Sequence, residues 1–276
     1  MRKLFTLAAM IIMMSLGSLI AQDQKGSEED FTPHGAPILK VFTNFNSTWK
    51  GGRNLSQFEI TRAYLGYEHT FTKNFSGRLI LDVGDPGVGG FKNVAYLKNA
   101  FLKYKVGKFS ASFGMIPSNQ FEIQEKIWRH RYIMKSFQDE YKFGPSADLG
   151  LIVDYQIADF VSVDAAFMNG EGYKLIQLDT TFKASVGATF TVFENMIIRG
   201  YYDITTADTN QQTIAAFVGW NAAKWSVGGE YNLQLNHFNN DGHDLSGFSF
   251  YGSYEFNKHI GVYGRYDYLE SSELEG

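Results

Sequence analysis

The sequence predicts an all-β protein, a transmembrane antiparallel up-and-down β-barrel, on three observations. Thirteen runs of alternating apolar and polar residues follow one another from residue 38 onward. The connections between these runs alternate between long and short. One face of the runs carries so many charges that it could not line a dry core, although it could line a water-filled lumen.

The alternation is clearest in residues 58–82. Leu65 and Tyr67 fall on one face of the first run, whereas Arg62 and Glu68 fall on the other. A period of two places successive side chains on opposite sides of a sheet. The same period predicts strands at 38–49, 57–71, 75–83, 95–106, 109–116, 147–156, 160–168, 182–191, 196–204, 211–221, 225–237, 246–256 and 259–269.

The connections predict which end of the sheet faces which side of the membrane. The first, at 50–56, is long, the second, at 72–74, is short, and this alternation continues along the chain. Outer-membrane barrels have short periplasmic turns and longer external loops. Aromatic pairs that flank the short turns predict a girdle at one membrane interface. The pairs are Phe71 and Phe75, Tyr104 and Phe109, Tyr155 and Phe160, Phe190 and Phe193, Trp220 and Trp225, and Tyr254 and Phe256.

Charged residues of the strands predict the lining of a pore. A lysine or arginine on the lipid-facing side costs about 2–4 kcal/mol at the membrane midplane, so these residues are expected to face the lumen. The expected pore-lining residues are Arg62, Arg78, Asp82, Lys103, Lys105, Asp164, Lys183, Arg199, Asp203, Glu230, Arg265 and Asp267. Charges of both signs in a wet lumen set a field that acts on permeating ions.

The chain begins with a segment typical of export. Residues 1–21 combine Arg2 and Lys3 with an apolar stretch and then small residues, which predicts a signal peptide. Residues 22–37 are polar, without periodicity, and are expected to be flexible. Residues 38–276 form the expected barrel. Because an even number of strands is usual and no closing strand follows the thirteenth, the sequence favours a truncated barrel of sixteen strands in the full-length protein, or of fourteen.

Residues 117–146 are the longest stretch without strand periodicity. Phe121, Ile127, Trp128, Met134 and Phe137 recur at roughly helical spacing, which predicts a helix-containing loop. A long loop of a wide barrel can fold inward and narrow the pore, or can form an external helix. The inward arrangement would place Arg129, His130 and Arg131 at the constriction.

The sequence lacks the motifs of several other activities. There is no cysteine, no H-E-x-x-H and no G-x-S-x-G, so no catalytic residue, no metal site and no cofactor is expected. The glycine-rich stretch 84–90 lacks the Lys-Ser/Thr ending of a phosphate-binding loop, and 239–244 lacks the full spacing of a calcium loop. A formal net charge of −4 argues against nucleic-acid binding.

Four stretches carry a resemblance to a known family: ITRAYLGYEHTF (60–71), LKNAFLKYKVGKFSASFGMIP (97–117), GPSADLGLIVDY (144–155) and FMNGEGYKLIQLD (167–179). Together they resemble the phosphate-selective porin O and P family of outer-membrane proteins. The resemblance implies a sixteen-stranded homotrimeric porin with a cationic lumen. In this chain the inward cations are interleaved with a similar number of carboxylates, which departs from that family.

The sequence therefore favours a porin of the bacterial outer membrane, in contact with lipid, through which small hydrophilic solutes or ions, including anions such as phosphate, diffuse passively. The alternative is an outer-membrane barrel that has an enzymatic role or binds an external partner and does not conduct.

Overall fold

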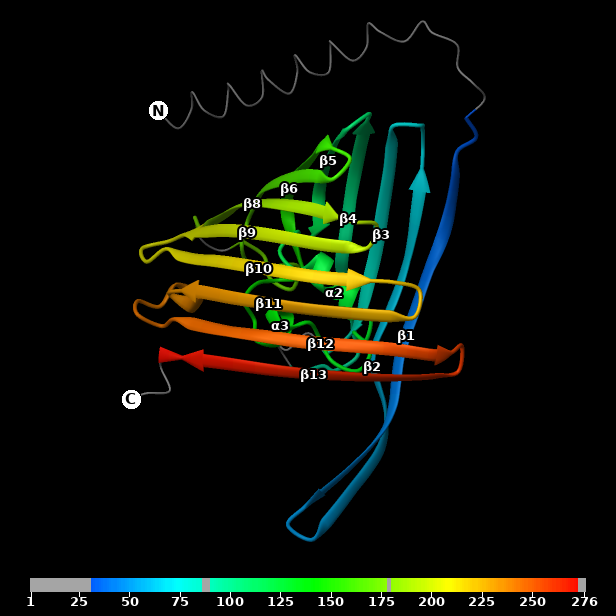
Figure 1. Ribbon diagram of the computed structural model, residues 1–276, viewed down its shortest axis with the longest axis vertical. Helices are drawn as coiled ribbons and strands as arrows, with labels where there is room; N and C mark the ends of the chain where they lie inside the picture. Colours follow the sequence, from blue (N-terminus) through cyan, green and yellow to red (C-terminus); the bar gives the residue numbers. More distant parts are fainter. Residues whose placement is uncertain (1–30, 86–89, 178–179, 273–276) are drawn as a thin grey trace, which may run out of the picture. The chain divides into compact units, whose positions relative to one another are not determined.

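The alternating runs form thirteen strands of one antiparallel sheet in the computed structural model of the chain, which describes residues 31–85, 90–177 and 180–272 (Figure 1). The strands are β1 (His34–Lys50), β2 (Arg53–Thr70), β3 (Phe75–Gly84), β4 (Val94–Val106), β5 (Phe109–Pro117), β6 (Ala147–Ala158), β7 (Val161–Met168), β8 (Phe182–Val192), β9 (Met196–Thr206), β10 (Gln211–Asn221), β11 (Trp225–Leu235), β12 (Leu245–Asn257) and β13 (Ile260–Ser271).

The topology is the predicted up-and-down meander. Each strand pairs with the next one along the chain, from β1 to β13, and among the described strands β1 and β13 do not pair with each other. Figure 1 shows the first strands running steeply across the direction of the last ones, as the right-handed twist of a large sheet requires. The expected signal peptide at 1–21 and most of the expected flexible segment at 22–37 lie outside the described residues.

The first hairpin differs from the expectation. Residues 50–56 do not form a long loop, because β1 and β2 continue to Lys50 and Arg53 and only Gly51 and Gly52 lie between them. Both glycines have positive φ, at 59° and 76°, which a two-residue hairpin turn of this kind requires at both central positions. β1 also begins at His34, before the expected start at residue 38.

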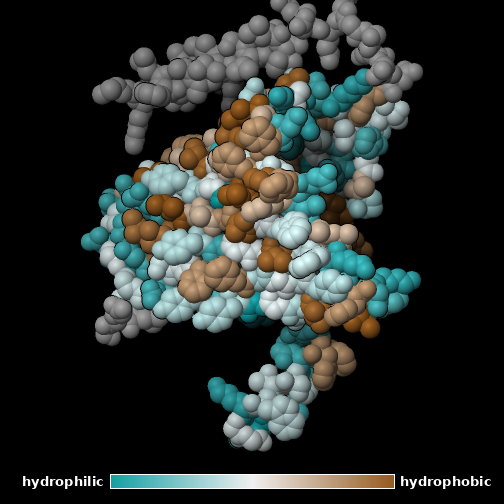
Figure 2. Space-filling view, viewed as in Figure 1, coloured by the Kyte–Doolittle hydropathy of each residue, from teal (hydrophilic) through white to brown (hydrophobic). Residues whose placement is uncertain are grey.

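The two faces of the sheet differ as the sequence predicts. Large apolar side chains such as Leu102, Val186 and Phe250 are exposed on one face, whereas Asp82, Lys183 and Asn232 are buried on the other. Figure 2 shows apolar and aromatic residues over β8 to β13 and hydrophilic residues gathered near the strand ends. We call the exposed apolar side the outer face and the polar side the inner face. An apolar outer face suits a sheet whose surroundings are lipid.

The aromatic residues of the short turns lie on the outer face near one end of the sheet. Trp220 and Trp225 stack across the β10–β11 turn with ring centroids 5.8 Å apart, and Tyr254 lies 6.3 Å from Trp225. Phe75 and Tyr104 lie 4.9 Å apart on neighbouring strands. Exposed aromatic rings in a band are typical of the interfacial girdle of an outer-membrane barrel.

Two short helices, α2 (Glu122–Trp128) and α3 (Phe137–Glu140), lie in the segment between β5 and β6. Arg129 ends α2 in the left-handed conformation with φ 61°, so the helical spacing of the sequence does not produce one continuous helix. A third short element, η1 (His237–Asn239), lies between β11 and β12. Among the described residues, no helix has the length and apolar character needed to cross a membrane.

Candidate functional site

The segment that connects β5 to β6, residues 118–146, packs against the inner face of the sheet. We call this segment the inward loop. Its helix α2 contacts β10 and β11. Ile127 and Trp128 of α2 form a buried cluster with Phe217 of β10 and Tyr251 of β12. The Tyr251 hydroxyl donates a hydrogen bond of 3.1 Å to the Gln124 carbonyl, so the loop is fixed by polar as well as apolar contacts.

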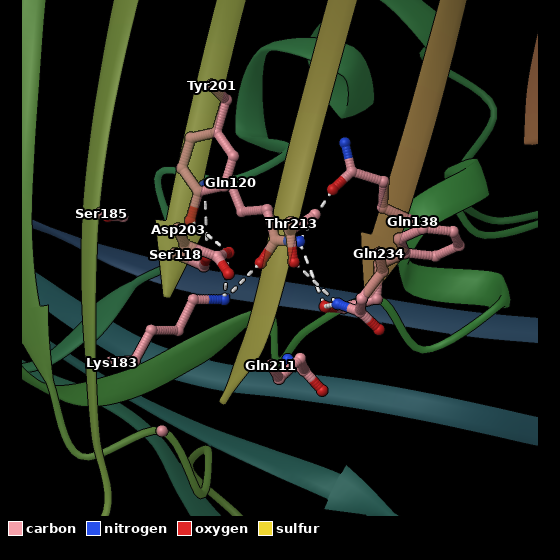
Figure 3. Close-up of polar contacts among 12 residues, drawn as sticks. Ser118, Gln120, Gln138, Lys183, Ser185, Tyr201, Asp203, Gln211, Thr213 and Gln234 are labelled. Carbon is pink, nitrogen blue, oxygen red and sulfur yellow. Dashed lines mark hydrogen bonds and ion pairs between the residues drawn. The ribbon is translucent and has the colours of Figure 1, made fainter. Parts of the chain in front are cut away.

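A buried polar network joins the inward loop to β8 and β9 (Figure 3). The Lys183 ammonium lies 2.8 Å from the Asp203 carboxylate and donates to Gln120 Oε1 over 2.7 Å. Gln120 in turn donates to Gln138 Oε1 over 2.9 Å. Both charged side chains are almost wholly inaccessible to water, at 3% and 0% exposure. A charge pair buried to this degree is held only while each group keeps its partner.

The network continues onto β10 and β11. The side-chain amide of Gln234 donates to Thr213 Oγ1 over 2.8 Å and to the Phe143 carbonyl over 2.7 Å. Gln120 also donates to that carbonyl over 3.2 Å. Phe143 lies near the end of the inward loop, shortly before β6. It packs with Phe137 and Leu245 in a second apolar cluster. The returning half of the loop is therefore fixed to the same wall.

Arg199 of β9 makes a second anchor. Its guanidinium lies 2.6 Å from the Asp164 carboxylate and donates to the Asn119 carbonyl over 2.7 Å. Asn119 also donates to Asp164, and Ser185 donates to Asn119 Oδ1 over 3.3 Å. The inward loop thus rests on β7 to β12, in part through Asp164, Lys183 and Arg199, which the sequence predicts to line the pore.

Open space remains on the opposite side of the inward loop. A cavity of about 440 Å³ separates it from β1 to β5. The lining residues are Ile38, Lys40, Phe42, Tyr64, Arg78, Ile80, Lys98, Asn99 and Pro117 of the strands, and Ser118, Phe121, Glu122, Glu125, Lys126, Arg129, Arg131, Tyr132 and Ser146 of the loop. A second cavity of about 270 Å³ shares Arg78, Pro117 and Glu122 with it. The two cavities follow one side of the loop.

Cations predominate in the larger cavity. Six lysine and arginine side chains line it, against the two carboxylates Glu122 and Glu125. Glu122 is paired with Lys126 at 2.8 Å and Glu125 with Arg131 at 3.3 Å. Burial raises the pKa of Glu125, whereas the Arg131 charge lowers it. The local electrostatic balance therefore favours anions.

Lys98 enters this cavity because β4 carries a bulge. Ile80 of β3 pairs with Asn99 and Leu81 pairs with Leu97, which leaves Lys98 without a partner residue on β3. A bulge of this kind redirects a side chain. The Lys98 ammonium lies over the Tyr64 and Tyr173 rings, at 4.8 Å and 5.2 Å, and donates to the Tyr64 hydroxyl over 3.2 Å. No ion pair joins it to a carboxylate in the described part of the chain.

The smaller cavity is closer to neutral. Arg78 and Lys103 line it together with Glu68, Glu122 and Asp154. Arg78 donates to the Glu68 carboxylate over 2.8 Å, so its charge is largely balanced. This arrangement places Arg78 at the junction of a cationic and a nearly neutral cavity.

A third cluster fixes another loop to the wall. Arg62 Nε lies 3.2 Å from the buried Asp82 carboxylate, and the Tyr173 hydroxyl donates to the same carboxylate over 3.1 Å. Tyr173 lies in the connection between β7 and β8. Burial, and then the Asp82 charge, raise the pKa of Tyr173, so that it remains a hydrogen-bond donor. Gly170 and Gly172 donate to Asp148 over 2.6 Å and 3.2 Å and fix the same connection.

The expected pore-lining residues thus separate into groups. Arg78 and Lys103 border cavities, whereas Lys183 with Asp203 and Arg199 with Asp164 lie beneath the inward loop. Arg62 and Asp82 hold the β7–β8 connection as described above. Arg265 and Asp267 pair with each other at 2.6 Å, and Arg265 donates to the Lys135 carbonyl of the loop. Glu230 is buried beside Asn232, and Lys105 is exposed.

Arg129, His130 and Arg131 contact different partners and do not form one cluster. Arg129 donates to Asn221 at the β10–β11 turn and lies 3.6 Å from Glu255. The His130 and Tyr263 ring centroids lie 4.9 Å apart. Burial, followed by the neighbouring Arg129 charge, lowers the pKa of His130. Arg131 faces Asp139 at 3.0 Å as well as Glu125. Arg129 and Arg131 nevertheless both border the larger cavity.

Sequence reasoning missed Lys98 and Gln120. Strict alternation assigns Lys98 to the outer face, because Asn99 and Phe101 point inward; only a register shift explains its position. Gln120 is uncharged and belongs to no motif, so the sequence does not mark it as a site residue, although it connects Lys183 to the inward loop. Among the described residues, no group of three or more His, Cys, Asp or Glu side chains is arranged to hold a metal ion.

The connection between β11 and β12 should become more mobile in acid. Burial, followed by the charges near it on His243 and Lys142, lowers the pKa of His237 to about 4. Because an unfolded histidine titrates near pH 6.5, the contribution of neutral His237 to stability is present above about pH 6.5 and is lost as the pH falls through about 4. The protection factors of residues 236–244 against hydrogen exchange, which correct for the intrinsic pH dependence of the exchange rate, should be lower at pH 4.5 than at pH 7.5. A His237→Gln variant should lose this difference, and an unchanged difference would contradict the assignment.

The fold and the inward loop define a class of structure, an up-and-down antiparallel sheet with the β5–β6 connection packed on its inner face. Comparisons with protein-family models and with curated proteins find no match. Solved structures do match. An outer-membrane expressed OmpT of Vibrio cholerae has a TM-score of 0.57 and 12% identity, over 90% of this chain and 80% of that chain. A structure described as a porin refined at 1.8 Å resolution has a TM-score of 0.53 and 11% identity, over 86% of this chain and 85% of that chain. At these identities the likeness shows the fold alone.

Proposed function

We propose that this protein is a porin through which small hydrophilic solutes or ions diffuse passively. The observation that carries the proposal is the pair of adjoining cavities between the inward loop and β1 to β6. The loop rests on β7 to β12 through buried contacts, and the two cavities beside β1 to β6 support a path for solutes there. A charged, water-accessible path fits diffusion of hydrophilic solutes, with no catalytic step.

The proposal extends to a preference for anions. The larger cavity has six cationic side chains against two carboxylates, and within the described residues Lys98 forms no ion pair with a carboxylate. This balance supports the resemblance of the sequence to the phosphate-selective porin O and P family. The smaller cavity, where Glu68, Glu122 and Asp154 face Arg78 and Lys103, would weaken the preference along the path. We therefore propose a moderate anion selectivity.

The remaining parts of the proposal concern location and assembly. Residues 1–21 are proposed as a signal peptide that directs the chain to the bacterial outer membrane, where the apolar outer face contacts lipid. The porin-type fold supports a homotrimer as the proposed assembly. The two solved structures named above are an outer-membrane protein and a porin, in keeping with this location.

Planar-bilayer recording tests the proposed function. The protein should produce stepwise currents, and a potassium chloride gradient should give a reversal potential whose sign shows that chloride crosses faster than potassium. Phosphate added to one side should carry current as well. A protein that inserts into the bilayer but gives no steps would refute the porin assignment, whereas steps with a cation-selective reversal potential would refute only the anion preference.

A further inference from the structure

The larger cavity beside the inward loop has large apolar side chains in its wall. Side chains that face a water-filled lumen are expected to be polar. Ile38 and Phe42 of β1 and Ile80 of β3 nevertheless line this cavity, and all three are half-buried. None of them belongs to a buried apolar cluster of the described residues. Packing of the loop on the sheet therefore does not account for them, and their apolar surface is available to a molecule in the cavity.

The strand register gathers part of this apolar surface around a glycine. Gly66 of β2 pairs with Ile38 of β1 on one side and with Ile80 of β3 on the other. No side chain stands between the two isoleucines, and a Cβ at Gly66 would come within 2.9 Å of Ile80 Cγ1. Phe121 of the inward loop lines the same cavity. An apolar group that lies against the isoleucines would thus be removed from water.

Two cations without a carboxylate partner lie next to this apolar surface. Lys40 pairs in register with Tyr64, and the Lys98 ammonium lies 3.2 Å from the Tyr64 hydroxyl. In the described part of the chain neither lysine forms an ion pair with a carboxylate. The other four cations of the cavity each lie within 3.6 Å of a carboxylate; they are Arg78, Lys126, Arg129 and Arg131. Tyr64 and Gly66 are two residues apart on one strand, so about 7 Å separates the charged part from the apolar part.

We propose that the larger cavity is a binding site for carboxylate anions that carry an apolar ring or chain. The carboxylate lies beside Tyr64, between Lys40 and Lys98. The apolar body contacts Ile38 and Ile80. This inference rests on the proposed function and names its substrate class.

The size and chemistry of the cavity fit this class of solute. Its volume of about 440 Å³ lies within the range of roughly 300–1,000 Å³ that is usual for sites of small organic molecules, which combine apolar walls with a few polar groups. An inorganic anion such as phosphate would use the two lysines but none of the apolar surface. A site on a diffusion path must also release its solute, so the binding is expected to be weak.

Block of the chloride current through the unaltered full chain tests the site. Phenylacetate, added to one side of a planar bilayer, should interrupt the current at a concentration roughly ten-fold lower than acetate does, because burial of about 60 Å² of its ring is worth that factor. Benzyl alcohol, which has the ring without the charge, and phosphate, which has the charge without the ring, should both be weaker than phenylacetate. Acetate, benzyl alcohol or phosphate acting as strongly as phenylacetate would overturn the proposal.

Substitutions in the cavity separate its two parts. Ile38→Thr with Ile80→Thr should raise the blocking concentration of phenylacetate roughly four-fold or more, the factor for one buried methylene group, and leave that of acetate unchanged. Threonine keeps the strand preference of both positions. Lys40→Gln should weaken the block by both anions. Ile60→Thr is the control, because Ile60 is 61% exposed and borders neither cavity. An unchanged phenylacetate block in the double threonine variant would contradict the assigned site.

A binding measurement does not depend on conductance or on any variant. Calorimetric titration of phenylacetate into the unaltered protein in detergent, with the heat of empty micelles subtracted, should show binding that acetate at the same concentrations does not. Channel steps together with an absence of phenylacetate binding would overturn the site alone. Phenylacetate binding to a protein that inserts but gives no channel steps would support the site and refute the porin function.

Discussion

Replacing Lys183 by Met should destabilise the protein and enlarge its conductance. Asp203, with a side chain that is 0% exposed, would keep its negative charge without the ammonium 2.8 Å away. Breaking a buried ion pair by removing one partner costs about 3–5 kcal/mol. Gln120 would also lose the donor that connects it to β8. Since Gln120 holds Gln138 and the Phe143 carbonyl, the inward loop would leave its wall more often and widen the path.

Two measurements check this result, the thermal unfolding midpoint in detergent and the single-channel conductance in a planar bilayer. Lys105→Met is the matched control, because it removes the same charge from an exposed position on the same face. The control should unfold and conduct nearly as the unaltered protein does. If Lys183→Met behaved like Lys105→Met in both measurements, the inward loop would not be held by this network.

Replacing Lys98 by Glu should shift the ion selectivity from anions toward cations. The substitution changes the charge at the cavity by two units. Two unit charges about 8 Å apart in water interact by about 0.5 kcal/mol, so two units amount to about 1 kcal/mol for a passing ion. The permeability ratio of chloride to potassium should therefore fall by roughly five-fold or more. Lys98→Gln should give about half of this change in free energy.

The reversal potential in a potassium chloride gradient measures the shift. Lys108→Glu supplies the control, because Lys108 lies at the β4–β5 turn, where its ammonium contacts the Ile157 carbonyl at 3.4 Å and does not border either cavity. A similar change in selectivity from both variants would mean that the field acts over the whole protein rather than at the cavity. No change from Lys98→Glu would place the ion path elsewhere.

The strands were predictable because their signal is local. Leu65, Tyr67 and Leu79 alternate with polar residues at the period that a sheet imposes, and neither face needs information from distant parts of the chain. The fold class and all thirteen strands are confirmed, with boundaries that differ by a few residues at most. The first hairpin was the exception, because the polar residues near its tip resembled a loop although they alternate as the outer half of a longer ribbon.

The candidate site was less predictable. Lys183 and Arg199 are predicted to line the pore, yet their burial depends on Gln120 and Asn119, which are more than sixty residues away in sequence. Alternation identifies the face of a side chain but not what covers that face. For Lys98 even the predicted face is wrong, because a single bulge in β4 turns its side chain to the face opposite to the one that alternation predicts.

The sequence by itself determined the strands, their faces and the end at which the short turns lie, because a period of two and local turn chemistry fix these features. Only the tertiary structure decided where the inward loop rests. Its position depends on buried partners that meet across long stretches of chain, above all Gln120 with Lys183 and Tyr251 with the Gln124 carbonyl. Those contacts leave the cavities beside β1 to β6, where Arg78 and Lys98 border the path that we propose for solutes.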